Sequence, residues 1–386
     1  MSNTKMKGQD RIICQTSFCI MCLTNLLLSV SLFSILSVLP LQPEIRDATP
    51  LWKGSGAIAL FGLGIYLFGP LNSYLVETYR RKRICILSIL ILITIAGVFC
   101  IINGKIETAS LRILQGAVYG LVQMSLGSTL LNDLVSSKNR TQADYIFSWS
   151  GRLGIPLGLF CGFYLQSILG VESVFILAIA CGLFSLAILF RINVPFKAPL
   201  SPKKISLDRF WQPQATFLFF NLLICLVALG ILIGSIQSFE FYGLMTIGFI
   251  SSWGVQRIFE NADLRSEVVI GLLLTAASIL LIYTNESQGA LHIASFLSGL
   301  GFGLFSSRLF LYFLKLSGHC QRGTLQHTYT LGLESGIYLG YWMSSFVSNP
   351  YILSIGFIVL ALIMYVTITH SWFMKHRDRS FRFREI

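Results

Sequence analysis

The chain divides into twelve long apolar runs separated by short polar breaks, and this pattern restricts its fold more than any other feature. Each run holds about 20 residues, the length with which a helix crosses the roughly 30 Å hydrocarbon core of a bilayer. The runs lie near residues 14–38, 55–76, 84–102, 108–132, 142–168, 172–191, 213–236, 240–258, 267–284, 289–314, 324–346 and 350–372. Because the chain is 54% hydrophobic and only 12% charged, we predict an all-α polytopic membrane protein with twelve transmembrane helices.

The positions of the basic residues predict the orientation of these helices. With the N-terminus inside, only Arg46, Lys53 and Lys105 fall on the outer side, and three more arginines lie within predicted helices. All other Lys and Arg residues fall on the inner side, which is the positive-inside pattern. Topology and contact with anionic lipid therefore explain the net charge of +12 better than nucleic-acid binding does. We expect both termini in the cytoplasm and the protein in a bacterial inner (plasma) membrane.

Local patterns recur between the first six and the last six helices. Three glycines spaced by four residues occur in both halves, and so do a Gly-Ser-Glu/Gln pattern and an asparagine before Leu-Leu. The matching sets are Gly154, Gly158 and Gly162 with Gly332, Gly336 and Gly340; Gly69, Ser73 and Glu77 with Gly248, Ser252 and Gln256; and Asn25 with Asn221. Since six is an even number, both halves start on the same side of the membrane, so the repeat is parallel. We predict an N-terminal half over 1–192, a cytoplasmic linker over 193–212, a C-terminal half over 213–372 and a basic tail over 373–386.

The glycine triplets place a smooth stripe on one face of helices 142–168 and 324–346. Such stripes let two helix backbones approach closely in lipid. Two interpretations stay open at this point. The stripes serve static packing, or they form a surface on which the two halves slide across each other.

Two motifs add to this architecture. In helix 108–132, Arg112 stands shortly before Gln115 and Gly116. The loop after the second helix reads "SYLVETYRRKR", with an acid followed by a run of four bases. Together with the parallel duplication, these motifs resemble the major facilitator superfamily, although Ser73 and Arg80 replace two glycines of the family's loop pattern. The resemblance implies a secondary active transporter that works by alternating access.

The resemblance also implies a gate at the cytoplasmic side. Glu77 would lie near the N-terminus of helix 324–346, where the helix dipole favours an anion, and Arg81 would pair with Asp133. The expected gate residues are Ser73, Glu77, Arg81, Lys82, Asp133, Gln256 and Arg257.

Two charged residues lie deep in predicted helices. Arg152 and Glu334 are each about ten residues from the cytoplasmic end of their helix, hence roughly 15 Å into the membrane. An isolated charge at this depth costs several kcal/mol, so such residues generally face a wet cavity or a partner. Glu334 is the candidate proton carrier, and Arg152 is the candidate for binding an anionic group of a substrate. A direct ion pair between them is the alternative.

Further residues are expected to support these two. Gln115 shares a helix face with Arg112 and can hold its guanidinium group, and by resemblance Arg112 assists proton transfer. Arg112 and Arg308 both lie close enough to a helix end to snorkel toward it. Five residues are expected to line the substrate cavity with Arg152, or else to bond and pack against neighbouring helices: Asn25, Gln123, Asn221, Trp149 and Tyr329.

We expect a monomeric, proton-coupled transporter of a small organic solute, working in export rather than uptake, with the solute, the proton and the lipid bilayer as partners. The segment "GIPLG" around Pro156 does not match the helix 5 pattern seen in many exporters of the family. No cofactor or metal is expected, because His and carboxylate residues do not cluster at ligand spacing. The alternatives are a membrane-embedded transferase, against which the lack of a catalytic residue set speaks, and a receptor built on a transporter fold.

Overall fold

The computed structural model describes residues 16–39, 55–102, 105–136, 139–192, 207, 209–258, 264–318 and 321–382. Within them the chain forms helices and no strand. The elements of the first half are α2 (Thr16–Val38), α4 (Ser55–Thr78), α5 (Arg81–Phe99), α6 (Lys105–Ser125), the π-helical η2 (Leu126–Leu130), α7 (Leu131–Leu134), α8 (Arg140–Leu169) and α9 (Val171–Phe190). Those of the second half are the 3-10 turn η3 (Pro213–Ala215), α10 (Thr216–Ser235), α11 (Phe239–Ile258), α12 (Leu264–Thr284), α13 (Gln288–Leu316), α14 (Arg322–Ser344), α15 (Pro350–Met364), the π-helical η5 (Tyr365–Thr369) and α16 (His370–Arg382).

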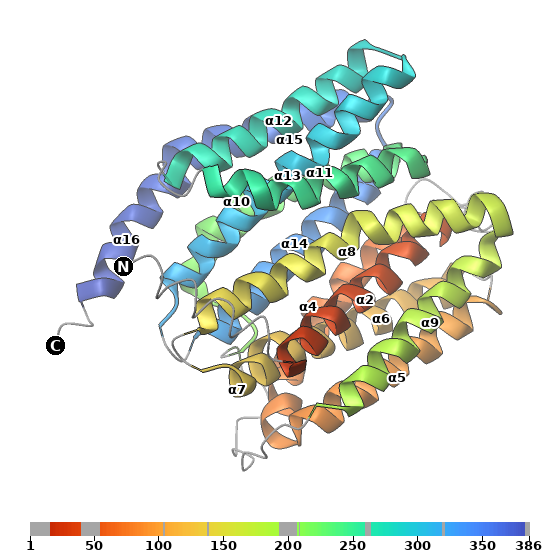
Figure 1. The fold of residues 1–386 in the computed structure, drawn as a ribbon, viewed down its shortest axis with the longest axis vertical. Helices are drawn as coiled ribbons and strands as arrows, with labels where there is room; N and C mark the ends of the chain where they lie inside the picture. Colours follow the sequence, from red (N-terminus) through yellow and green to blue (C-terminus); the bar gives the residue numbers. More distant parts are fainter. Residues whose placement is uncertain are drawn as a thin grey trace.

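These elements confirm the predicted all-α fold. Because α6, η2 and α7 follow one another as one rod, and α15, η5 and α16 as another, the described residues contain twelve rods that run alongside each other (Figure 1). The last rod continues as a helix to Arg382, but its part long and apolar enough to cross a membrane ends at His376, near the predicted end at 372. Most of the predicted linker lies outside the described residues.

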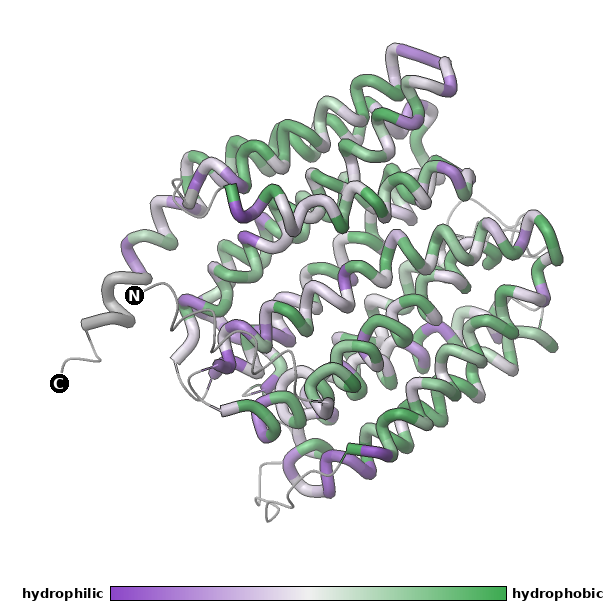
Figure 2. The backbone as a smooth tube through the Cα atoms, viewed as in Figure 1, coloured by the Kyte–Doolittle hydropathy of each residue, from purple (hydrophilic) through white to green (hydrophobic). Residues whose placement is uncertain are grey.

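Apolar residues dominate the rods, and polar residues gather at their ends (Figure 2). Among the described residues, nine helical segments are long and apolar enough to cross a membrane. The rods that fall short of this are those of α6, α11 and α14, which carry more polar side chains. Two of these three supply the polar cavity described below.

The same helix pairs form in the first and second six rods. In the first half α2 packs against α8 and α9, α4 against α6, and α5 against α9. In the second half α10 packs against α14 and α15, α11 against α13, and α12 against α15. Helices at corresponding positions therefore have corresponding neighbours, as expected for two parallel six-helix halves.

The glycine stripes bring helices together inside each half. A Cβ atom on Gly158 would lie 2.9 Å from the carbonyl oxygen of Val30 in α2, and one on Gly340 would lie 2.1 Å from that of Val227 in α10. Of the two interpretations left open by the sequence, the structure favours static packing, because the stripes face helices of their own half.

The two halves meet along the α8–α11 and α4–α14 contacts. We call the end of the bundle where α5 begins the basic end. Toward that end Trp149 packs against Trp253, with ring centroids 4.9 Å apart. Toward the opposite end Phe163 stacks on Tyr242, with centroids 5.4 Å apart. The halves therefore touch on both sides of the middle of the bundle.

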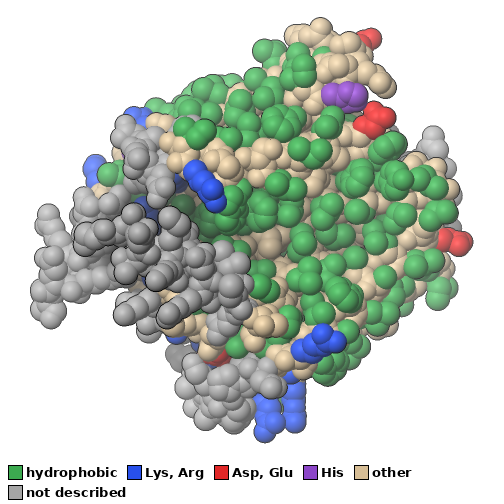
Figure 3. Space-filling model, viewed as in Figure 1, with side chains coloured by type: hydrophobic (Ala, Val, Ile, Leu, Met, Phe, Trp, Pro, Cys, Tyr) green, Lys and Arg blue, Asp and Glu red, His purple; other side chains and the backbone are tan. Residues whose placement is uncertain are grey.

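The surface agrees with a membrane environment. On the face shown in Figure 3, hydrophobic side chains cover most of the bundle, while Lys and Arg lie toward the left and lower end and most acidic side chains lie at the opposite end. This distribution matches an apolar belt with a basic rim on one side.

Candidate functional site

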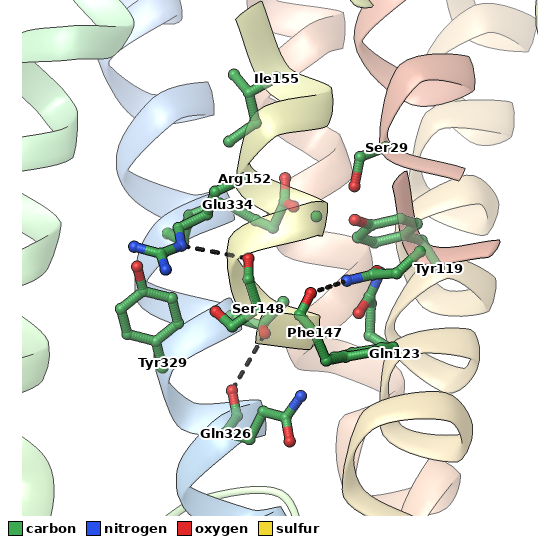
Figure 4. Close-up of a pocket in the computed structure, with 14 residues that line it drawn as sticks. Ser29, Tyr119, Gln123, Phe147, Ser148, Arg152, Ile155, Gln326, Tyr329 and Glu334 are labelled. Atoms are coloured by element: carbon green, nitrogen blue, oxygen red, sulfur yellow. Dashed lines mark hydrogen bonds between the residues drawn. The ribbon is translucent and has the colours of Figure 1, made fainter. Parts of the chain in front are cut away.

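A small polar cavity lies near the middle of the bundle, between the contacts at its two ends. It has a volume of about 30 Å³, room for about two water molecules. Side chains of α2, α6, α8 and α14 line it: Asn25, Ser29, Tyr119, Gln123, Phe147, Ser148, Gly151, Arg152, Ile155, Gln326, Tyr329, Thr330, Leu333 and Glu334. Both deeply placed charges predicted from the sequence are among them (Figure 4).

The guanidinium group of Arg152 reaches from α8 of the first half to α13 of the second. Its Nη1 donates to the hydroxyl oxygens of Ser306, at 2.8 Å, and Ser307, at 3.0 Å. The group also lies over the rings of Phe310 and Tyr329, with 5.8 Å to each centroid. The side chain is 2% exposed, and its Nη2 has no hydrogen-bond partner among the described residues. Arg152 therefore carries a buried positive charge, and its Nη2 is a hydrogen-bond donor with no partner among the described residues.

Glu334 comes from α14 and is equally buried, at 2% exposure. Its carboxyl group lies on the side of Tyr119 and Ser29, whereas the Arg152 guanidinium lies beside Tyr329 (Figure 4). The Glu334 Oε2 atom has no hydrogen-bond partner in the described part of the chain, and no ion pair joins Glu334 to Arg152 there. The cavity thus holds a cation and an acid that point apart.

Asn25 and Gln123 form the wall of the cavity on the side of the first half. The Nε2 of Gln123 donates to the Oδ1 of Asn25 at 3.0 Å, and the Nδ2 of Asn25 donates to the carbonyl oxygen of Phe147 at 2.8 Å. This chain of hydrogen bonds links α6, α2 and α8. Both predicted roles therefore coincide, since the residues line the cavity and also tie three helices together.

Two of the residues predicted for the cavity lie elsewhere. The Nδ2 of Asn221 donates to the carbonyl oxygen of Ala361 in α15, at 2.9 Å, so this residue joins two helices of the second half. The Trp149 ring packs on Phe249 and Trp253 of α11. Trp149 lies on α8, which lines the cavity with other residues, whereas α10, which carries Asn221, does not line it.

Arg112 and Gln115 lie together but outside the cavity lining. The Nη1 of Arg112 donates to the Oε1 of Gln115 at 2.7 Å, and its guanidinium group lies over the Phe99 ring, 5.7 Å from the centroid. Arg112 is 0% exposed, so the prediction that it snorkels outward was wrong. Gly116 permits the close approach of α4, because a Cβ atom there would lie 2.0 Å from the carbonyl oxygen of Phe61.

Arg308 does not snorkel either. It lies in α13 and forms an ion pair with Glu267 of α12, and the side chains are 13% and 3% exposed. The sequence places Glu267 at the first residue of a predicted helix, which gave no indication that it would be buried. The pair joins two neighbouring helices of the second half.

The predicted gate residues form ion pairs and caps at the basic end. The Nη1 of Arg81 lies 2.6 Å from the Oδ2 of Asp133, which is the pairing implied by the family resemblance. Glu77 forms an ion pair with Arg209, in the segment that precedes α10. The Nζ of Lys82 donates to the carbonyl oxygen of Phe190, at 3.0 Å. These contacts tie α5 to α7 and α9, and α4 to the segment that precedes α10.

The remaining gate residues differ in their surroundings. The hydroxyl of Tyr145 in α8 donates to the Oε1 of Gln256 in α11, which makes this a contact between the halves. Ser73 is 0% exposed, whereas Arg257 is exposed at the end of α11.

Sequence reasoning missed several residues of the site. Ser306 and Ser307 hold Arg152, yet serines in an apolar helix carry no distinguishing signal. Asp144, outside the cavity lining, is also buried, at 1% exposure, with Arg140 and Arg322 as the nearby cations.

Comparison with known proteins identifies the family. The model of the Major Facilitator Superfamily matches residues 21–259, more than half of the chain, while a search of curated protein sequences finds no match. The chain is similar in structure to the human organic anion transporter MFSD10 (TETRAN), with a TM-score of 0.63, 17% identity, and coverage of 91% of this chain and 99% of that one. It is also similar to a bacterial homologue of the iron transporter ferroportin in an outward-facing state, with a TM-score of 0.60, 14% identity, and coverage of 92% and 99%. The chain, an integral multi-pass membrane protein, therefore belongs to the major facilitator superfamily of transporters.

Proposed function

We propose that this transporter moves a small organic anion by alternating access, that it is coupled to protons, and that it works in the export direction expected from the sequence. The observation that carries the proposal is a central cavity, built by both halves, in which a buried arginine and a buried carboxyl group point apart. In this proposal the halves 1–192 and 213–372 rock about the cavity as two bodies.

Arg152 is the proposed anchor for the anion. A guanidinium group offers donors in a planar fork that matches a carboxylate or a phosphate. Two of its nitrogens bond within the protein, Nε to the Ser148 carbonyl and Nη1 to the two serines of α13. The Nη2 atom supports the proposal because it has no such partner in the described residues. A bound anion would supply that partner and compete for the serine contacts.

Glu334 is the proposed proton carrier. Burial of a carboxyl group favours its protonated form, whereas a guanidinium group nearby favours the ionised form. Arg152 and Glu334 belong to different halves, so rocking changes the distance between their charges. Each change of conformation then alters the tendency of Glu334 to hold a proton, which couples proton movement to the motion.

A flux assay in proteoliposomes tests the proposal. Purified protein is reconstituted, and uptake and release of labelled organic anions, neutral solutes and organic cations are measured in both directions with and without a pH gradient. We expect flux of anions that responds to the gradient. A transferase would instead turn over its substrate without flux, and a receptor would bind without either.

Arg152→Gln tests the anchor in the same assay. Hydrogen bonds to a charged group contribute about 1.5–3 kcal/mol, so we expect KM for the anion to rise about ten- to hundredfold. Arg191→Gln, an equal charge change at an exposed position in the C-cap of α9, serves as the matched control. Transport of a purely cationic solute that anions do not compete for would overturn the proposed substrate class.

A further inference from the structure

A second cavity lies on the outside of the bundle, away from the transport site. It is a groove of about 670 Å³ between the end of α4, the first turns of α5 and Leu121 of α6. Figure 1 shows α5 with α9 at the edge of the bundle, and α5 packs mainly against α6 and α9. The face of α5 toward α4 is left open, so the groove lies where lipid surrounds the protein.

The groove changes character along its length. Arg80 and Arg83 line it at the basic end of the bundle, and Leu75, Ile84, Leu87 and Ile91 form walls further along. Residues 80, 83, 84, 87 and 91 follow the spacing of one helix face. From Arg83 to Ile91 the helix rises about 12 Å, which carries the groove from the membrane surface well into the hydrocarbon layer.

We propose that this groove binds an anionic phospholipid from the leaflet at the basic end. The phosphate would lie at Arg80 and Arg83, and one acyl chain would lie along Ile84, Leu87 and Ile91. The two arginines match a lipid phosphate in charge, and the apolar walls lie at the depth of an acyl chain, which argues for this occupant. A soluble anion would use only the arginines, and an uncharged hydrophobic molecule would use only the walls.

The two parts of the groove make different contributions to binding. Lipid tails are as apolar as the walls, so burying a tail there gains little hydrophobic free energy, and the walls act through their shape. A basic residue near the surface of an anionic membrane contributes on the order of a fivefold preference for the charged lipid. With two arginines, we expect about a thirtyfold preference for phosphatidylglycerol over phosphatidylcholine with the same chains.

Native mass spectrometry of the full-length protein, titrated with each lipid in detergent, tests this assignment. Arg80→Gln with Arg83→Gln should bring phosphatidylglycerol binding down to the level of phosphatidylcholine. Arg191→Gln with Lys375→Gln removes two charges from exposed residues outside the groove and should keep the preference. No preference in the wild-type protein, or an equal loss in this control pair, would overturn the proposal.

A second pair of variants tests the walls. Leu87 is 59% exposed, so Leu87→Trp fills the groove without disturbing the core, and it should reduce binding of both lipids. Leu90→Trp, at a position on the same helix that is 42% exposed and outside the groove lining, is the matched control. Unchanged lipid binding in Leu87→Trp would place the lipid elsewhere. Equal binding of glycerol phosphate and phosphatidylglycerol would assign the arginines to soluble phosphates and also overturn the proposal.

Discussion

At the scale of single residues, the sequence shows which side chains are unusual but not what surrounds them. Arg152 and Glu334 stood out because charges are rare at that depth, and both line the cavity. The sequence could not predict that Ser306 and Ser307, 154 and 155 residues away, would bond Arg152. Nor could it predict the burial of Arg112, because the Phe99 ring beside it comes from another helix.

The proposed proton site gives the first prediction at this scale. Glu334→Gln keeps the size of the side chain but removes its ability to release a proton. We expect solute exchange across the membrane to persist while the response to a pH gradient is lost, as measured by counterflow and by gradient-driven flux in proteoliposomes. Glu107→Gln, an exposed carboxylate in the first turn of α6, should behave as wild type.

Two outcomes contradict this role of Glu334. Gradient-driven flux at the wild-type rate in Glu334→Gln would assign the proton to another group. Loss of both exchange and gradient response would point to a requirement for the carboxylate in substrate binding.

At the scale of helices, apolar length predicted the elements, since a lipid-exposed span must satisfy its backbone hydrogen bonds internally. Which neighbouring helix each helix face meets was harder to predict from the sequence. The faces of Asn221 and Trp149 turn to α15 and α11, because close packing at glycine stripes fixes the rotation of a helix about its axis. A glycine stripe in the sequence shows that a helix packs closely, but not which neighbouring helix it packs against.

The stripe in α14 gives the second prediction. In Gly340→Ala, the added Cβ atom would lie 2.1 Å from the Val227 carbonyl oxygen, so α14 and α10 must separate. Overpacking of this kind destabilises by about 1–3 kcal/mol, and we expect a lower Tm in detergent. Gly356→Ala, in α15, adds a methyl group where no atom lies within 4 Å and should leave the Tm unchanged or raise it. Equal Tm values for the two variants would refute the close contact.

At the scale of the whole molecule, the parallel duplication predicted the architecture because six rods return the chain to the side where it started. The conformation was not predictable from the sequence. Aromatic contacts between the halves form toward both ends of the bundle, at Trp149 with Trp253 and at Phe163 with Tyr242. In this conformation the two halves therefore touch toward both ends of the bundle, on either side of the central cavity.

Cross-linking of these contacts gives the third prediction. In a cysteine-free background, cysteine pairs replace Trp149 and Trp253, or Phe163 and Tyr242, and a reducible bifunctional thiol reagent joins them. We expect each cross-link to stop solute flux and a reductant to restore it, because the proposed alternating access opens each end in turn. A pair at Phe217 and Trp372, which are 5.3 Å apart between ring centroids within the second half, should cross-link without loss of flux. Full flux with either pair between the halves joined would rule out opening at that end.

The location of the glycine stripes has a consequence for how the sequence tolerates change. Inside each half, contacts such as Gly158 with the Val30 carbonyl leave no room for any side chain. Between the halves, contacts such as Trp149 with Trp253 and Phe163 with Tyr242 join side chains, which other residues of similar size can replace. We therefore expect substitutions to be tolerated better at these side-chain contacts between the halves than at the glycine contacts inside each half.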